Sequence, residues 1–255
     1  MDKVVLATML PGASKVDDMN LNPTWKSPVY TDNGVKTAFV KLVEPRKIFV
    51  ECACAILGRA LGLPMPSPMV VKVTHDALPE VVAKGESKIA FGSEDVGHPS
   101  FRRRINDSSA EAMDLLGQYV QLLEISVFDE WIANHDRNIG NILFDGKIFS
   151  FIDHELALPS VMTDSSSACD NQLLRVFFSN KCEFEQHKAS KSVNTRILPG
   201  YTVLELNEIV DNTLAVKYFN AKDSSEVVKV LAKRIDQLIP LVHNRIGFKQ
   251  QGIAI

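Results

Sequence analysis

The stretch Asn134-His-Asp-Arg-Asn-Ile-Gly-Asn141 decides the fold, together with Asp153-His-Glu155, which begins twelve residues further on. Asp136 and Asn141 lie five residues apart in a polar segment, and Asp153 follows a short run of apolar residues. Between them, Asp145-Gly146 is typical of a tight β-hairpin turn. Because a hairpin returns the chain to its starting point, we expect Asp153 to lie close to Asp136 and Asn141.

These residue types suit phosphoryl transfer, which needs a Lys on the phosphates, Mg²⁺ held by oxygen ligands, and an Asp near the attacking hydroxyl. Asn141 and Asp153 offer the amide and carboxylate oxygens that Mg²⁺ prefers. Asp136 is the candidate base, since its spacing to Asn141 matches the Asp-x-x-x-x-Asn of kinase catalytic loops. A single Asp–Asn pair is more commonly plain turn chemistry, so the prediction depends on the remaining pattern.

The N-terminal part supplies a candidate ion pair. Residues 36–43 alternate as in a strand and place a cation, Lys41, among apolar residues. A helix is expected at about 46–61, and its apolar interior contains one acid, Glu51. A buried Glu without a partner is costly, so Lys41 is its candidate partner. The alternative is that both side chains reach solvent independently.

The other elements are read from periodicity and from turn residues. Strands are expected at 3–9, 69–74 and 88–93, and loops and turns at 11–34. A long helix is expected from Ser108 or Ser109 to about Ala133. The last third is expected to be mainly helical, at about 170–179, 201–218 and 223–248, with a break at Pro240.

A polar connector between residues 94 and 109 divides the chain into predicted lobes of 1–94 and 95–255. It contains Arg102-Arg-Arg104. This triplet is expected to be a solvated surface; the alternative is a contact with an acidic or phosphorylated partner.

The totals exclude some classes of protein. The 255 residues are 45% hydrophobic and carry a formal net charge of −3, which argues against nucleic-acid binding through bulk positive charge. The sequence contains no run of about 18 apolar residues, so we expect no membrane span. The four cysteines show no metal-ligand spacing, so we expect reduced thiols in a cytoplasmic protein.

The chain resembles the HipA-like kinases, a bacterial and phage branch of the protein-kinase-like superfamily, and its loop is similar to that of phosphoinositide kinases. The resemblance is carried by Phe39-Val-Lys-Leu42, the Glu51 helix ending in Leu61-Gly-Leu-Pro-Met-Pro66, Trp131 to Asn141, and Phe151-Ile-Asp-His-Glu155. It implies an α+β, two-lobed protein-kinase-like fold, with a small β-rich N-lobe, a mainly helical C-lobe and ATP between them.

The resemblance also implies roles by position. Lys41 would contact the α- and β-phosphates, Glu51 would pair with Lys41, Asp136 would be the base, Asn141 and Asp153 would bind Mg²⁺, and Phe91 and Ser93 would lie at the adenine.

Two features depart from this pattern. Asp153 is followed by His154 and Glu155, so there is no Phe-Gly switch. There is also no glycine-rich phosphate loop, and the polar segment between Gly12 and Gly34 is the candidate cover for the nucleotide.

The leading hypothesis is an ATP- and Mg²⁺-dependent kinase acting on Ser or Thr of a protein. One alternative is a small-molecule or lipid kinase, and another is a nucleotide-binding pseudokinase that acts as an inhibitory partner. The expected partners are a protein substrate and, from the resemblance alone, an antitoxin-like or regulatory protein; neither a membrane nor a nucleic acid is indicated.

Overall fold

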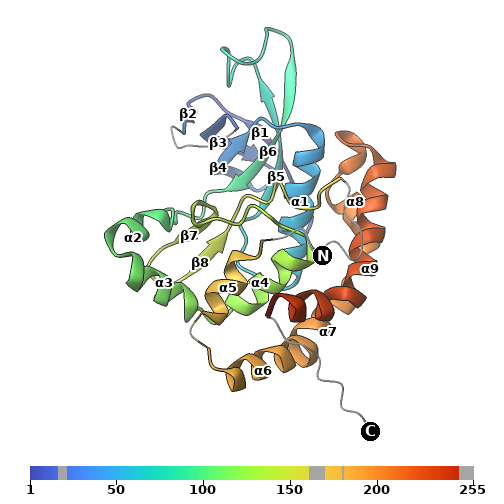
Figure 1. Cartoon of the computed structure of the whole chain (residues 1–255). Helices are drawn as coiled ribbons and strands as arrows, with labels where there is room; N and C mark the ends of the chain where they lie inside the picture. The colour runs from blue at the N-terminus through green and yellow to red at the C-terminus, as the bar shows by residue number, and fades with distance from the viewer. Residues whose placement is uncertain (17–21, 161–169, 180, 247–255) are drawn as a thin grey trace.

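The N-terminal part of the chain is a curved sheet with a helix packed against it (Figure 1). The computed structural model describes residues 1–16, 22–160, 170–179 and 181–246. In these residues the sheet has six strands in the order β1-β5-β6-β4-β3-β2. β1 pairs with β5 in parallel and with β3 in antiparallel register, so the sheet closes on itself. The strands are β1 (Val5–Met9), β2 (Ser14–Lys15), β3 (Thr24–Thr31), β4 (Gly34–Lys41), β5 (Pro68–Thr74) and β6 (Ser87–Glu94).

The prediction of loops throughout residues 11–34 is wrong, because β2 and β3 lie there. Trp25, Val29 and Thr31 alternate inward along β3 and are buried. Pro28 takes one of the positions between these residues and is only partly buried, and proline normally argues against a strand that is paired on both sides. The predicted turn before Gly34 is confirmed, since Thr31 and Gly34 close the β3–β4 hairpin.

Helix α1 (Pro45–Ala60) agrees closely with the predicted helix, and it is buried on every side from Ile48 to Gly58. One of its faces packs with Val70 and Phe91 of the sheet. The opposite face belongs to the core of the helical part, where Phe49 stacks on Phe219 with ring centroids 5.1 Å apart. This helix is therefore shared between the two parts of the molecule.

The helical part begins after the connector with α2 (Arg102–Asp107), α3 (Ser109–Gly117) and α4 (Leu122–Trp131). The prediction of one long helix to Ala133 is wrong, because α3 ends at Gly117 and the chain turns before α4 begins. Glycine is a poor helix former, and Val120, which lies in the turn between α3 and α4, is 82% exposed.

A two-stranded hairpin follows, made of β7 (Ile142–Phe144) and β8 (Phe149–Phe151) and preceded by the short 3₁₀ helix η1 (Ile139–Asn141). This confirms the predicted hairpin around Asp145-Gly146. The remaining elements are α5 (Gln172–Phe178), α6 (Glu183–Ser192), the π-helical η2 (Val193–Ile197), α7 (Leu198–Thr202), η3 (Leu206–Glu208), α8 (Ile209–Asn212), η4 (Ala215–Lys217) and α9 (Ala221–Ile246).

The predictions for the last third are only partly right. Residues 201–218 form several short helices, α6 was not predicted, and α9 continues through Pro240. Figure 1 shows that the last turns of α9 run in a different direction, as expected where proline bends a helix without ending it. Within the described residues, none of the helices combines the length and apolar character needed to cross a membrane.

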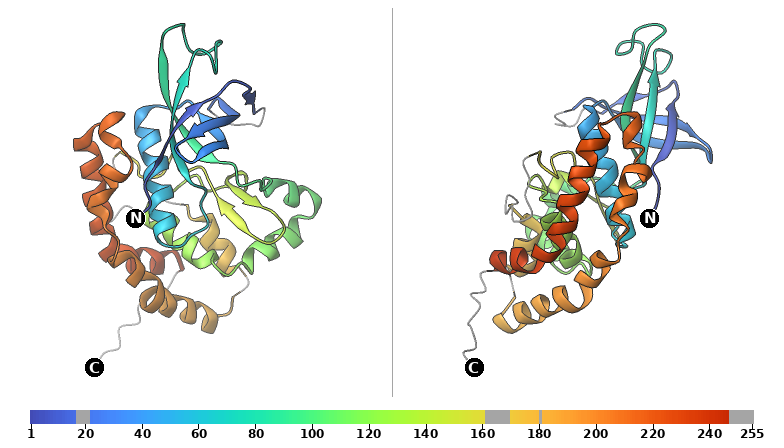
Figure 2. Two further views of the ribbon diagram at one scale, coloured as in Figure 1. Left: turned by 180° about the vertical axis from the view of Figure 1, so that it is seen from behind. Right: turned by 90° about the vertical axis from the view of Figure 1, so that its right-hand side faces the viewer.

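The β-rich N-terminal and helical C-terminal parts confirm the predicted α+β, two-lobed architecture, and Figure 2 shows the sheet at one end with α9 running alongside α1. The proposed division at residues 94 and 95 falls where β6 ends at Glu94.

Candidate active site

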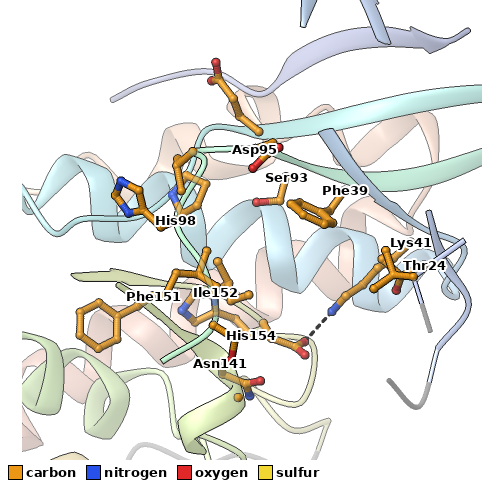
Figure 3. Close-up of a pocket in the computed structure, with 18 of the residues that line it drawn as sticks. Thr24, Phe39, Lys41, Ser93, Asp95, His98, Asn141, Phe151, Ile152 and His154 are labelled. Atoms are coloured by element: carbon orange, nitrogen blue, oxygen red, sulfur yellow. Dashed lines mark hydrogen bonds and ion pairs between the residues drawn. The ribbon is translucent and has the colours of Figure 1, made fainter. Parts of the chain in front are cut away.

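A cavity of about 850 Å³ lies between the sheet and the catalytic-loop region, and Figure 3 shows part of its lining. Strands β4 and β6 contribute Lys41, Phe91 and Ser93, and α1 contributes Glu51. Asp136, Asn141 and Asp153 lie on the other wall. All seven residues predicted from the sequence to form a site therefore line one cavity. Their chemical roles stay predictions.

Lys41, the last residue of β4, joins the two walls (Figure 3). Its Nζ lies 3.3 Å from Glu51 Oε1, which is the predicted ion pair, and 2.7 Å from Asp153 Oδ1. A third carboxylate oxygen, Glu155 Oε2, lies 3.7 Å away. A buried cation with this many acidic neighbours is compensated for its lost hydration.

The charged groups of this cluster shift one another's pKa values. Burial alone would lower the pKa of Lys41, but the carboxylates of Glu51 and Asp153 raise it above its ordinary value. Burial would raise the pKa of Glu51, yet Lys41 and His154 lower it to about 2. Burial and the neighbouring Glu51 carboxylate raise the pKa of Asp153. The Lys41 ammonium group opposes this rise in the pKa of Asp153.

The donor set fits a magnesium ion at Asn141 and Asp153. The Asn141 Nδ2 donates to the Asp136 carbonyl oxygen at 3.0 Å, so the Asn141 amide oxygen stays available as a ligand. Glu51, Asp153 and Glu155 offer carboxylate oxygens within 4.8 Å of one another. The Lys41 ammonium group contacts all three, and its single positive charge offsets only part of the negative charge of these acids.

The backbone at Asp153 is unusual, since its φ of 62° lies in the left-handed region. Non-glycine residues rarely adopt this conformation, and they do so chiefly where surrounding contacts hold them at functional sites. Here the amide of the next residue, His154, donates to Glu51 Oε2 at 2.8 Å. This bond fixes the turn that presents the Asp153 carboxylate to Lys41.

Asp136 lies in a loop that is braced by its own side chains. The Asn134 Oδ1 accepts from the Asp136 amide at 3.2 Å, and the Asn138 Nδ2 donates to the Asp136 carbonyl at 3.1 Å. The Asp136 side chain itself is only partly buried. Its carboxylate has no ion pair among the described residues, which leaves it open to a hydroxyl group in the cavity.

Arg137 is buried beneath this loop and pairs with Asp129. Its Nε donates to Asp129 Oδ2 at 2.9 Å and its Nη2 to Asp129 Oδ1 at 3.0 Å. Its Nη1 donates to the carbonyls of Asn141 and Ile152 at 3.3 and 2.6 Å. Arg137 therefore steadies both segments that carry the predicted metal ligands.

His154 and Glu155, which take the place of a Phe-Gly pair, received no role from the sequence. The His154 Nε2 lies 2.9 Å from the Arg137 Nη2, so this ring nitrogen is the acceptor. Glu155 Oε1 accepts from the Asn22 Nδ2 at 2.5 Å and lies 3.4 Å from the Lys47 Nζ.

These contacts tie the loop after β8 to the edge of the segment predicted to cover the nucleotide. Residues 17–21 of that segment are outside the described residues. The position of Glu155 two residues after Asp153 is the only sequence feature that points to a place near the site. Its partner Asn22 could not be predicted, because it is 133 residues distant in the sequence.

Phe91 and Ser93 lie where β6 approaches the connector. Phe91 is buried against α1, and Ser93 is partly exposed in the cavity. Phe39 and Met65 add apolar surface to the same lining. The position of an adenine ring beside Phe91 and Ser93 stays a prediction.

A sequence model of the family described as HipA-like kinase matches residues 34–236 of the chain. The match spans all seven predicted site residues and far more than half of the sequence. A search of curated proteins finds no match.

Among solved structures, the chain is similar to a Helicobacter pylori proinflammatory kinase, CtkA, with a TM-score of 0.55 and 13% identity over 94% of this chain and 98% of that one. It is also similar to Rad53 1-466 in complex with AMP-PNP, with a TM-score of 0.35, 15% identity, and 86% and 60% of the two chains covered. A MAP kinase from Leishmania major gives a TM-score of 0.31, 12% identity, and coverage of 95% and 84%. At such TM-scores only the first likeness bears on the fold.

Proposed function

Since the chain belongs to the HipA-like kinase family, we propose that it transfers the γ-phosphate of ATP, with Mg²⁺ as cofactor, to the hydroxyl group of Ser or Thr in a protein. The observation that carries this proposal is the gathering of Lys41, Glu51, Asp136, Asn141 and Asp153 around one cavity. They are the residue types that phosphoryl transfer needs, and they come from both lobes.

In this proposal each residue has a defined task. Lys41 holds the phosphates and is itself held by Glu51. Asn141 and Asp153 would hold Mg²⁺, which when bound neutralises charge on the phosphate oxygens. Asp136 accepts the proton of the attacking hydroxyl, for which its partly exposed and unpaired carboxylate is suited.

The test is transfer of labelled γ-phosphate from Mg-ATP to casein and to the protein itself. Asp136→Asn should lower transfer by about 10²- to 10⁴-fold, the usual contribution of a general base, while binding of a fluorescent ATP analogue is retained. Asp76→Asn is the matched control, because Asp76 lies exposed in the turn after β5, far along the chain from the loop.

The alternatives give different outcomes. Nucleotide binding without any transfer, unchanged by Asp136→Asn, would contradict the proposal and support a pseudokinase. Transfer to a small alcohol or a lipid but to no protein would support the proposed phosphoryl transfer and contradict the proposal that the acceptor is a protein.

A further inference from the structure

The helix α2 stands at the mouth of the cavity because the connector before it is anchored to the hairpin. Ser100 forms a β-bridge with Leu143 of β7. The Phe101 amide donates to the Ile142 carbonyl at 2.8 Å, and the Phe144 amide donates to the Pro99 carbonyl at 2.9 Å. Figure 1 shows α2 beside this hairpin as a result.

The Phe101 side chain strengthens this anchor. It is 1% exposed and packs edge-on against Phe144 and Phe149, with ring centroids 5.8 and 5.2 Å apart. Arg102 follows directly as the first residue of α2. The start of α2 is therefore held in place relative to the catalytic loop, which continues into β7.

Arg102 lies against that loop. A Cβ added to Gly140 would come within 2.7 Å of the Arg102 Nη2, so the guanidinium group occupies the space that a side chain at residue 140 would take. Arg102 and Arg103 both line the cavity that contains Asp136. Arg104, the next residue, does not line it.

The charges of these two arginines are unmatched. The lysines that line the cavity are paired: Lys41 with Asp153, and Lys26 with Asp95 at 2.6 Å. Arg102 and Arg103 are exposed, and neither forms an ion pair with any of the described residues. Two guanidinium groups thus face the cavity without a carboxylate.

We propose that Arg102 and Arg103 form an acceptor subsite that binds the carboxylates of an acidic peptide, so that the preferred Ser or Thr lies among Asp or Glu residues. The proposal rests on the proposed function and adds the substrate class. Guanidinium groups bind carboxylates through paired, charge-assisted hydrogen bonds. Because the subsite is exposed, salt should weaken its attraction.

The test compares fluorescent Ser peptides of equal length flanked by Asp and Glu, by Ala, or by Lys. Anisotropy measures binding and labelled ATP measures transfer. The wild type should bind the acidic peptide at least tenfold more tightly than the basic one, and less so in high salt. The double variant Arg102→Glu with Arg103→Glu should reverse this preference. Arg104→Glu is the matched control and should keep it.

Other outcomes overturn the inference. Equal binding of the three peptides by the wild type would exclude a charged subsite, and an equal effect of Arg104→Glu would indicate only general surface charge. A rise in the KM for ATP without a change in peptide preference would assign the arginines to the nucleotide.

The two proposals fail separately. If acidic peptides bind through Arg102 and Arg103 but no phosphate is transferred, the proposed function fails and the subsite stands. If phosphate is transferred without charge preference, the subsite fails and the proposed function stands.

Discussion

The cations at the Lys41 end of the cavity and those at the α2 end are held in different ways. Lys41 is mostly buried and contacts Glu51, Asp153 and Glu155. Arg102 and Arg103 are exposed and have no acidic partner among the described residues. The first arrangement is complete within the chain, whereas the second offers charge to another molecule. The difference separates groups that build the site from groups that select what enters it.

The comparison predicts that changes at the Lys41 end damage both activity and stability, while changes at the α2 end affect only the choice of acceptor. The largest effect is expected for Lys41→Met. Transfer should fall by about 10²- to 10³-fold, the usual result of losing one electrostatic clamp. Stability should fall by about 3–5 kcal/mol, because buried carboxylates lose their cation.

Mg²⁺ should raise the unfolding temperature of Lys41→Met more than that of the wild type, since Glu51, Asp153 and Glu155 stay grouped. Lys36→Met is the control, because the pair of Lys36 with Glu94 at 2.8 Å is partly exposed. If both lysine variants lower the free energy of unfolding by the same small amount, the contacts of Lys41 with the three carboxylates do not stabilise the fold as described above.

The next largest effect is expected for Arg137→Lys. A lysine keeps the charge but cannot form the two-pronged contact with Asp129 or reach the same carbonyls. We expect the free energy of unfolding in urea to fall by about 1–3 kcal/mol for each buried acceptor that is left without a donor. Arg175→Lys, in an exposed pair with Asp170, should change it by less than about 1 kcal/mol.

A smaller effect is expected for His154→Phe. Phenylalanine can occupy the site beside Phe128, but it removes the acceptor that Arg137 Nη2 contacts. A buried donor left without a partner costs about 1–3 kcal/mol. The His154 backbone bond to Glu51 does not depend on the side chain, so transfer should fall less than in Lys41→Met. Equal losses of transfer would show that the ring itself organises the phosphate end.

The smallest effect is expected in how steeply the free energy of unfolding changes with pH. The pKa of Glu51 falls from 4.5 to about 2 on folding, so its contribution to stability is present above about pH 4.5 and is lost as the pH falls toward 2. Glu51→Gln should therefore show a weaker decline in the free energy of unfolding over this range. Identical slopes for the two proteins would contradict the lowered pKa.

The site was predictable from the sequence where its signal is local. Asp136, Asn141 and Asp153 lie on one loop and the hairpin after it, and the ion pair of Lys41 with Glu51 joins residues ten apart. Strand β3 was missed because it contains Pro28, and proline is uncommon in paired strands. The end of α3 at Gly117 was missed because apolar residues continue past it in the sequence. In both places the local sequence favours one structure, and the packing of the folded chain produces another.

The contacts between residues far apart in the sequence could not be predicted. Asn22 meets Glu155 across the two lobes, and Arg102 meets Gly140 within the helical lobe, where the two residues are also far apart in the sequence. The arginine triplet looked uniform in the sequence. Its first two members line the cavity and the third does not, a distinction that depends on the anchoring of Phe101 by β7.

The burial of α1 on both faces has a consequence for how the activity can be turned on and off. Eleven consecutive residues from Ile48 to Gly58 are buried, in two separate cores. Burial of each large apolar side chain contributes about 1.5–3 kcal/mol, so swinging α1 outward to withdraw Glu51 would unpack both cores at once. A switch that moves this helix alone would therefore be costly. We expect any regulation of this protein to leave the pair of Lys41 and Glu51 assembled.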